Sequence, residues 1–136
     1  EVDAANRVQW MQTRQGMGYP VLVAEADGAV IGYAAFGGWR PFDGLRGTVE
    51  NSVEVAPEAR GQGVAQAGLA ALSPRARACG KHVIVAAITS ENAASLRLHE
   101  KLGFVETARM PEVGQKFGRW LELVFLQLRL DARAAP

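Results

Sequence analysis

The sequence has one cysteine in 136 residues, Cys79, which excludes an internal disulfide and any zinc site built on several thiolates. So little cysteine suits a reducing compartment, and we expect a cytoplasmic protein that holds no metal. Long apolar runs are missing as well, since no stretch approaches the ~20 residues of a transmembrane helix. The first residues, EVDAANR, are charged where a signal peptide would be apolar. The sequence therefore predicts a soluble protein without a membrane partner.

An excess of charge of either sign is also absent, because 15 lysines and arginines stand against 14 aspartates and glutamates. Binding to a nucleic-acid backbone relies on a basic surface that releases counterions, so we expect no nucleic-acid partner. The length suits one domain with a real core, which we take to span residues 1–136. Because the chain begins at glutamate rather than methionine, we expect this domain to be incomplete at its N-terminus.

The pattern along the chain alternates between helices and strands. Residues 4–15 are typical of a helix that ends at Gly16 and Gly18. The turn pair Asp27-Gly28 between two apolar segments predicts a hairpin of strands 21–26 and 29–36. The remaining predicted elements are, in order, strand 48–55, a helix from 64 to about 79, strand 82–88, helix 93–102 and strand 120–130. This order indicates an α+β fold with a mixed sheet.

Pro74 falls inside the second predicted helix, where a proline loses a hydrogen bond and clashes with the preceding turn. We therefore expect a kink or a restart there, with Ser73 as the cap and Pro74 at the first helical position.

The most informative segment is VEVAPEARGQGVA, residues 53–65, in which a strand leads through Gly61 and Gly63 into a helix. Unpaired N–H groups at a helix start lie beside the positive end of the helix dipole, and glycine lets phosphate oxygens approach closely. A tight turn with no ligand is the alternative. A nucleotide P-loop would need a lysine here, and a dinucleotide fingerprint would need glycine or alanine in place of Gln66. The turn therefore fits a pyrophosphate better than it fits either of these two motifs.

Two further segments place polar residues on one face. Strand 48–55 alternates so that Glu50, Ser52 and Glu54 share a side. The segment ENAASLRLHEKLGF predicts a helix with a polar stripe and an apolar stripe, formed respectively by Asn92, Ser95 and His99 and by Ala94, Leu98 and Leu102. These residues could serve catalysis, or they could be a solvated strand face and a helix cap with solvated neighbours.

Two motifs in order resemble those of the GNAT acetyltransferases. RGQGVA at 60–65 matches the pattern R/Q-x-x-G-x-G/A, and ENAASLRLHEKLGF is similar to the later motif in which an asparagine opens a helix. Across nearly the whole chain, YPVLVAEADG, GTVENSVEV, KHVIVAAI and KFGRW resemble the phosphinothricin acetyltransferase family and its methionine-sulfone-acetylating relatives. The resemblance implies a GNAT-like mixed, mostly antiparallel sheet flanked by helices, here without the first strand and helix.

The resemblance also implies the reaction, which is transfer of an acetyl group from acetyl-CoA to the amine of a small amino-acid-like acceptor such as phosphinothricin, methionine sulfone or methionine sulfoximine. Strand 52–55 would separate from strand 82–88, and pantetheine would insert between them. The implied cofactor-binding residues are Val53, Val55, Arg60, Gly61, Gln62, Gly63, Val64, Ala65, Asn92 and Ser95.

Catalytic and acceptor-binding roles follow from the same resemblance. Glu50 would deprotonate the acceptor amine, with Glu54 as its competitor, and His99 would protonate the departing thiolate. The loop before Glu50 would recognise the acceptor through Trp39, Arg40, Phe42 and Arg46. KFGRW at 116–120 would contribute to a homodimer interface.

Two other functions stay open. A non-catalytic CoA-binding domain would keep the glycine turn without a working base. A protein or peptide N-acetyltransferase would need an open groove, whereas the short aromatic loop at 37–42 favours a closed pocket for a small acceptor.

Overall fold

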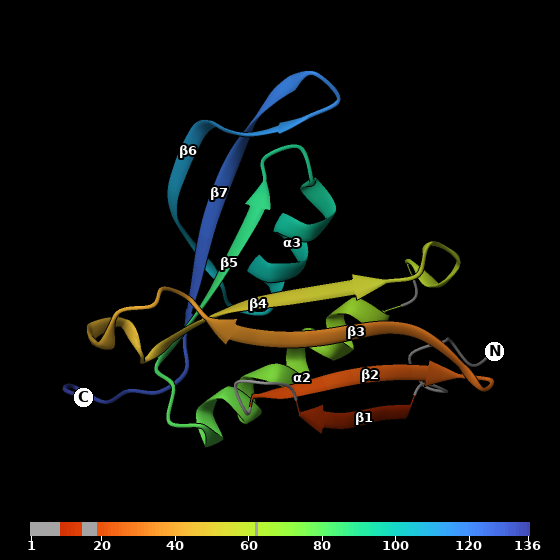
Figure 1. Ribbon diagram of the computed structural model, residues 1–136, viewed down its shortest axis with the longest axis horizontal. Coiled ribbons are helices and arrows are strands. Elements are labelled where there is room, and N and C mark those ends of the chain that lie inside the picture. The colour runs from red at the N-terminus through yellow and green to blue at the C-terminus, as the bar shows by residue number, and fades with distance from the viewer. Residues whose placement is uncertain (1–8, 15–18, 62) are drawn as a thin grey trace.

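The structure is a computed structural model in which residues 9–14, 19–61 and 63–136 are described (Figure 1). These residues form a seven-stranded sheet in the order β1-β2-β3-β4-β5-β7-β6. The neighbours pair antiparallel except β4 and β5, which are parallel. The strands are β1 Gln9–Arg14, β2 Pro20–Ala26, β3 Ala29–Gly38, β4 Thr48–Val55, β5 Val83–Thr89, β6 Val105–Lys116 and β7 Arg119–Arg129. The prediction of a mixed, mostly antiparallel α+β fold is confirmed.

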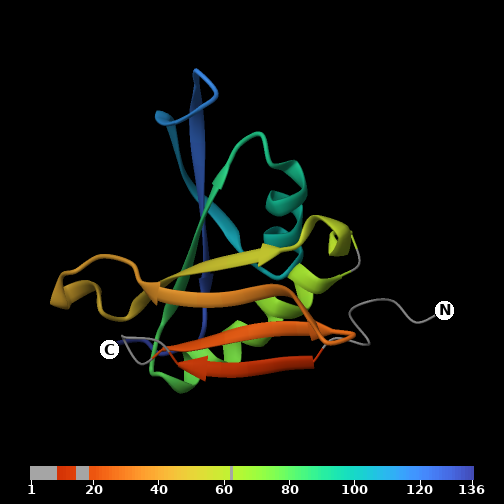
Figure 2. The same cartoon turned by 45° about the vertical axis from the view of Figure 1, so that its right-hand side comes forward.

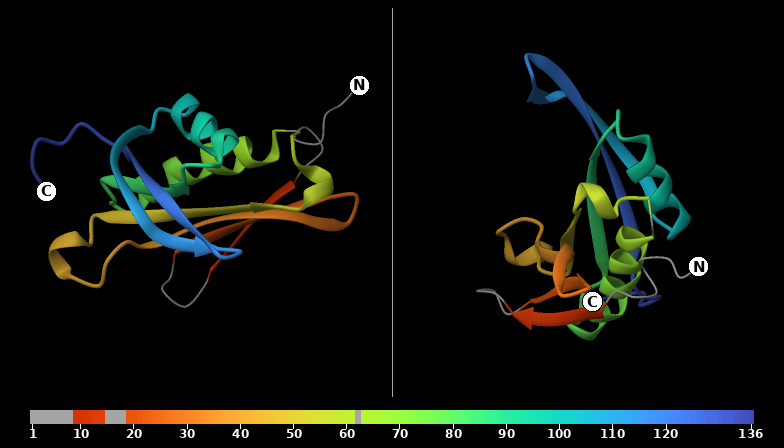
Figure 3. Two further views of the ribbon diagram at one scale, coloured as in Figure 1. Left: turned by 90° about the horizontal axis from the view of Figure 1, so that it is seen from above. Right: turned by 90° about the vertical axis from the view of Figure 1, so that its right-hand side faces the viewer.

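Helices α2 (Val64–Ala78) and α3 (Ala93–Lys101) cover the same face of the sheet (Figure 3). In α2 the buried residues share one face, as expected of an amphipathic helix, and they are Val64, Gly68, Leu69, Leu72 and Ala76. The last three of these pack in one core with residues of the central strands such as Leu22 and Val49, both fully buried. Two short 3-10 helices, η1 Asp43–Leu45 and η2 Pro57–Ala59, flank β4. Within the described part of the chain, no helix is long and apolar enough to cross a membrane.

The hairpin predicted at Asp27-Gly28 is confirmed. Both residues have positive φ, 53° and 78°, as the two-residue turn that matches the twist of a hairpin requires. Strands β2 and β3 pair from Ala26↔Ala29 to Val21↔Ala35. The hairpin thus positions β3, the strand with which β4 pairs antiparallel.

The predicted helix at 4–15 is wrong for residues 9–14, which form strand β1; residues 4–8, 15 and the predicted stop at Gly16 and Gly18 lie outside the described residues. The strand pairs with β2 from Gln9↔Glu25 to Arg14↔Pro20. Its sequence, QWMQTR, includes Trp and Thr, which suit a strand, and pairing with the edge of β2 outweighs a weak local helical pattern.

The restart expected at Ser73 is also wrong, because α2 runs through Pro74 as one helix. Proline removes the hydrogen bond to the carbonyl of Ala70, yet both residues are exposed, so water can bond to that carbonyl. The next carbonyl, of Ala71, also accepts a hydrogen bond from Arg75 Nη1 at 2.9 Å. A proline on the solvent side of a helix whose other side packs in the core does not end the helix.

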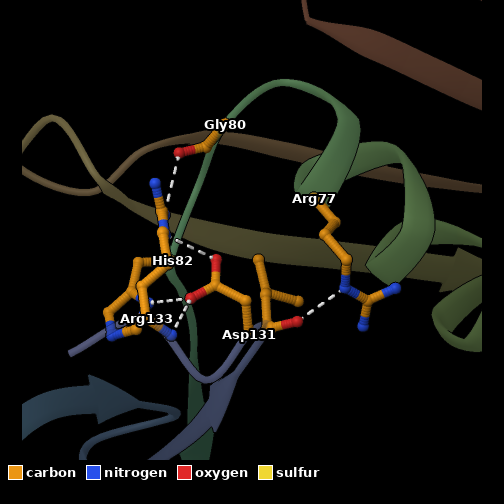
Figure 4. A network of polar contacts seen from close by, with 6 residues as sticks. Arg77, Gly80, His82, Asp131 and Arg133 are labelled. Atoms are coloured by element: carbon orange, nitrogen blue, oxygen red, sulfur yellow. Dashed lines mark hydrogen bonds and ion pairs between the residues drawn. The ribbon is translucent and has the colours of Figure 1, made fainter. Parts of the chain in front are cut away.

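A cluster of polar contacts holds the segment after β7 against the start of β5 (Figure 4). His82 Nδ1 donates to Asp131 Oδ1 at 2.9 Å, and Arg133 Nε lies 3.0 Å from Asp131 Oδ2. Arg133 also donates to the Gly80 carbonyl at 3.3 Å, and Arg77 to the Leu130 carbonyl at 2.5 Å. Hydrogen bonding by Arg133, helped by His82, lowers the pKa of Asp131 to about 2. The cluster ties together the end of α2, β5 and the C-terminal segment.

Candidate active site

The centre of the sheet opens where β4 leaves β5. Their register consists of three pairs, Thr48↔Val83, Val49↔Ile84 and Glu50↔Val85, after which the strands diverge (Figure 1). A cleft of about 920 Å³ lies at this point, lined by β4, β5, the glycine turn, the N-terminal part of α2 and one side of α3. The separation expected of strand 52–55 from strand 82–88 is confirmed.

Strand β4 presents main-chain groups to this gap. Ala56 N donates to Ile31 O at 2.7 Å and Trp39 N donates to Thr48 O at 3.3 Å, and the β3–β4 register between them is unbroken. Hydrogen-bonded pairs alternate in an antiparallel ladder, so every second residue of β4 bonds to β3 through its main chain. The main-chain N–H and C=O groups of the residues between them point away from β3. Val53 and Val55 are among these residues. Their N–H and C=O groups therefore face the gap, where Arg60 Nε already donates to the Val55 carbonyl at 3.2 Å.

The facing strand β5 also presents main-chain groups to the gap. Leu130 N donates to His82 O at 2.7 Å and Ser90 N donates to Glu122 O at 3.0 Å, with an unbroken β5–β7 register between them. By the same alternation, the main-chain groups of Ala87 point toward β4, beyond the last β4–β5 pair. The gap can therefore accept a ligand that carries amide donors and acceptors in an extended chain.

The glycine turn lies at one end of the cleft and opens helix α2. Gly61 and Gly63 have φ of 78° and 82°, and Gly63 is the N-cap, with no hydrogen-bonding side chain. The first bond inside the helix runs from Ala67 N to Gly63 O at 3.0 Å, so the three preceding N–H groups have no intrahelical partner. This is the geometry of an anion site at the positive end of a helix. The cleft lining includes Arg60, Gly61, Gly63, Val64 and Ala65, whereas Gln62 lies outside the described residues.

Helix α3 forms another wall. Asn92 Oδ1 accepts a hydrogen bond from Ser95 N at 3.1 Å and so caps the helix. Asn92, Ser95 and His99 all line the cleft, as does part of the apolar stripe, Ala94 and Leu98. The polar stripe therefore faces the cleft, but it shares this wall with apolar side chains.

His99 is only 6% exposed and both of its ring nitrogens have partners. Nδ1 lies 2.8 Å from the Ser95 carbonyl oxygen, which can only accept, so Nδ1 carries a proton. Nε2 lies 3.1 Å from Asn51 Nδ2, and the ring meets Phe104 edge-on. Burial lowers the pKa of His99, opposed in part by the hydrogen bond to Ser95. The imidazole is therefore neutral near pH 7.

Asn51 was not singled out from the sequence, although a signal existed. In β4 it alternates with Val49 and Val53 and so lies on the apolar, helix-facing side of the strand. A polar residue in an apolar row needs a buried partner, and His99 provides it.

The two acids of β4 leave the strand on the opposite side from Asn51, by the same alternation. Glu50 is half-buried and is the last β4 residue paired with β5, while Glu54 is exposed; both line the cleft. Helices α2 and α3 cover one face of the sheet (Figure 3), and the contact of Asn51 with His99 of α3 shows that Asn51 is on this face. A ligand that reached the gap from the other side would therefore meet Glu50 where the strands separate.

The loop residues expected to recognise the acceptor lie at the end of the β3–β4 hairpin, and the structure does not bring them into the cleft lining. Trp39 is half-buried, whereas Arg40, Phe42 and Arg46 are exposed. Arg46 Nη1 donates to Asp43 O at 2.9 Å, and the Arg46 carbonyl accepts from Lys81 Nζ at 2.6 Å. These contacts hold the loop in a defined shape beside the start of β4.

The β6–β7 hairpin extends beyond the rest of the sheet (Figure 2). At its tip, Phe117 and Trp120 are 88% and 66% exposed, and a second hollow of about 340 Å³ is lined by residues 115–120. No group of three or more His, Cys, Asp or Glu side chains that could hold a metal ion occurs among the residues that the structure describes.

A sheet that splits beside a glycine turn and a capped helix leaves a cleft of the shape that a long, phosphate-bearing ligand needs. Residues 2–104 match the acetyltransferase (GNAT) family. An L-methionine sulfoximine/L-methionine sulfone acetyltransferase of Salmonella typhimurium is 59% identical over 99% of this chain and 79% of its own. A phosphinothricin N-acetyltransferase of Alcaligenes faecalis is 43% identical over 85% of this chain and 59% of its own. The chain therefore belongs to the GNAT family of N-acetyltransferases.

Solved structures agree with this assignment. The structure of yncA from Salmonella typhimurium with its cofactor acetyl-CoA has a TM-score of 0.86 and 61% identity, over 88% of this chain and 69% of that one. A phosphinothricin acetyltransferase of Sinorhizobium meliloti in complex with acetyl-CoA has a TM-score of 0.79 and 41% identity, over 82% of this chain and 61% of that one.

Proposed function

We propose that this chain transfers the acetyl group of acetyl-CoA to the amine of a small amino-acid-like acceptor of the methionine sulfoximine, methionine sulfone or phosphinothricin type. The observation that carries the proposal is the continuous cleft that joins the glycine turn, the separated strands and Glu50. The acceptor class rests on the names of the relatives at 59% and 43% identity. The proposed location is the cytoplasm, in keeping with a single cysteine.

Acetyl-CoA would lie along the cleft. Its pyrophosphate would accept hydrogen bonds from the free N–H groups at the start of α2, in the segment 60–65. Its pantetheine would extend between the strands, against the main-chain groups of Val53 and Val55. Asn92 and Ser95 would contact this arm from α3, since both line the same cleft.

Glu50 would act as the base. It takes a proton from the acceptor ammonium, so that the amine gains the lone pair with which it attacks the thioester carbonyl. A C–N bond forms, the carbonyl oxygen becomes an oxyanion, and collapse then breaks the C–S bond. His99 would give a proton to the departing thiolate. Because this histidine is neutral at rest, it must first receive a proton, and the nitrogen of the tetrahedral intermediate has one to release.

Trp39, Arg40, Phe42 and Arg46 would bind the acceptor once it occupies the space beside Glu50, with an arginine on its carboxylate. A homodimer would bury the exposed aromatic tip at 116–120, because apolar side chains as exposed as Phe117 and Trp120 are typical of an interface.

The test is a thiol-release assay with acetyl-CoA and each acceptor, together with polyamines and a peptide amine. Glu50→Gln should lower kcat by about 10²–10⁴-fold while leaving acetyl-CoA affinity nearly unchanged. Glu54→Gln is the matched control, since it removes the same charge four residues along the strand, on the same face. A larger loss in Glu54→Gln would move the base to Glu54. Binding of acetyl-CoA without release of thiol for any acceptor would favour a non-catalytic CoA-binding domain.

A further inference from the structure

We propose that Asn51 is a positioning residue that donates a hydrogen bond to Nε2 of His99 in its Nδ1–H tautomer and so fixes the lone pair of Nε2 where β4 and β5 separate. The assignment of the tautomer follows from geometry. A backbone carbonyl cannot donate, so the contact of 2.8 Å between Nδ1 and Ser95 O requires a proton on Nδ1. In the neutral ring Nε2 is then an acceptor, and the amide nitrogen of Asn51 at 3.1 Å is its donor.

The same contact connects helix α3 to β4. Asn51 follows Glu50, the last residue of β4 that pairs with β5. On one side of this point β4 is held by β5, and on the other it is held across the cleft through Asn51 and His99. The side chain of Asn51 therefore anchors β4 to α3 at the place where the strand leaves its neighbour.

An amide suits this position because it can serve both protonation states of the ring. It donates through Nδ2 to a bare Nε2 and, after a half-turn, accepts through Oδ1 from a protonated one. An aspartate could only accept, and it would therefore favour the imidazolium. This part of the inference rests on the proposed function, in which His99 receives a proton and passes it to sulfur.

The charged groups around His99 do not set the protonation state of its Nε2. Glu50 and Glu54 line the same cleft but leave β4 on the opposite side, and Arg60 is exposed at the turn. On α3 itself, Glu100 and Lys101 are exposed. The pKa of His99 is shifted by burial and by the Ser95 carbonyl, with no charged side chain among the causes. Asn51 is thus the polar side chain through which the state of Nε2 can be changed.

The experiment is nitrogen NMR of protein labelled at histidine, without acetyl-CoA, across a pH titration. The sequence has two histidines, so His82 serves as an internal reference. We expect His99 in the wild type to show a protonated Nδ1 and a hydrogen-bonded, unprotonated Nε2. Asn51→Asp should raise the pKa of His99 by about one to three pH units and move the His99 limb of the pH–rate profile in the same direction. Ser52→Asp is the charge control, because it adds a carboxylate on the opposite side of the strand and should shift the pKa much less.

If Asn51→Asp does not fold, Asn51→Leu tests the same point. It should keep the tautomer, which Ser95 fixes, and move the Nε2 resonance toward that of a free acceptor nitrogen. A wild-type ring with its proton on Nε2 would overturn the inference. An Nε2 resonance that does not move in Asn51→Leu, or equal pKa shifts in Asn51→Asp and Ser52→Asp, would also overturn it. Because the NMR measurement needs no turnover, a lack of acetyl transfer would refute the proposed function and leave this inference standing.

Discussion

Replacing Gly63 with valine tests whether the start of α2 holds the pyrophosphate. Gly63 has φ of 82° and ψ of 4°, a left-handed conformation that costs an L-residue roughly 1–2 kcal/mol and more if the side chain is β-branched. A domain with about 5–15 kcal/mol of stability survives this, and its Tm should fall by roughly 4–8 °C. The new side chain would also displace phosphate oxygens from the helix N–H groups. Loss of one such charge-assisted hydrogen bond, about 1.5–3 kcal/mol, raises the Kd for acetyl-CoA about 10- to 150-fold.

A matched variant at the other end of the same helix distinguishes the two effects of Gly63→Val, which are backbone strain and exclusion of the ligand. Gly80 follows the C-cap of α2 with φ of 78°, and an added Cβ there would meet nothing within 4 Å. Gly80→Val should therefore lower Tm by a similar amount and leave the Kd for acetyl-CoA unchanged, as measured by calorimetry at a temperature where both variants are folded. Equal Kd values for Gly63→Val and the wild type would show that the pyrophosphate binds elsewhere. Equal losses of affinity in the two valine variants would show that strain alone explains the effect.

Two further predictions follow from the surface of the molecule. The pKa of Asp131, about 2 in the folded protein and below its usual 3.8, means that its contacts stabilise the fold above about pH 4 and cease to do so as pH falls toward 2. Asp131→Asn should therefore lower Tm at pH 7, with the gap to the wild type closing below pH 4 in thermal melts; a gap that stays constant down to pH 3 would contradict this. Phe117→Ser combined with Trp120→Ser should convert the proposed dimer to a monomer in sedimentation experiments, and a wild type that sediments as a monomer would refute the dimer.

The sequence was informative wherever the signal is local. Asp27-Gly28 predicted its hairpin because few residues tolerate two successive positive φ values. Strand 48–55 was predicted with its observed bounds, because alternation along it reflects one covered face. The glycine turn is also a local signal, and it predicted the start of α2 with its free N–H groups. That an anion binds there stays a prediction.

The errors and the omission involve partners distant in sequence. Strand β1 owes its state to hydrogen bonds with β2, which a local helical pattern in residues 9–14 does not reveal. Pro74 does not end α2 because it lies on the solvent-exposed side of the helix. The pair Asn51 and His99 is 48 positions apart, and neither motif predicts the other. His99 stays a proposed catalytic residue, and its neutral resting state, which depends on burial, could not be deduced from helical spacing.

The position of the cleft follows from how β5 is held. Its pairing with β7 is antiparallel and unbroken over seven residues, whereas its pairing with β4 is parallel and ends after three. As twist accumulates along the sheet, β5 stays with the strand that holds it along its whole length, and the sheet opens at the shorter parallel contact. The main-chain groups exposed by this opening need hydrogen-bonding partners, which an extended ligand with amide groups can supply. The separation of β4 from β5 also leaves Glu50 beside the gap, at the last pair before the strands part, so the opening that would admit the cofactor also positions the proposed base.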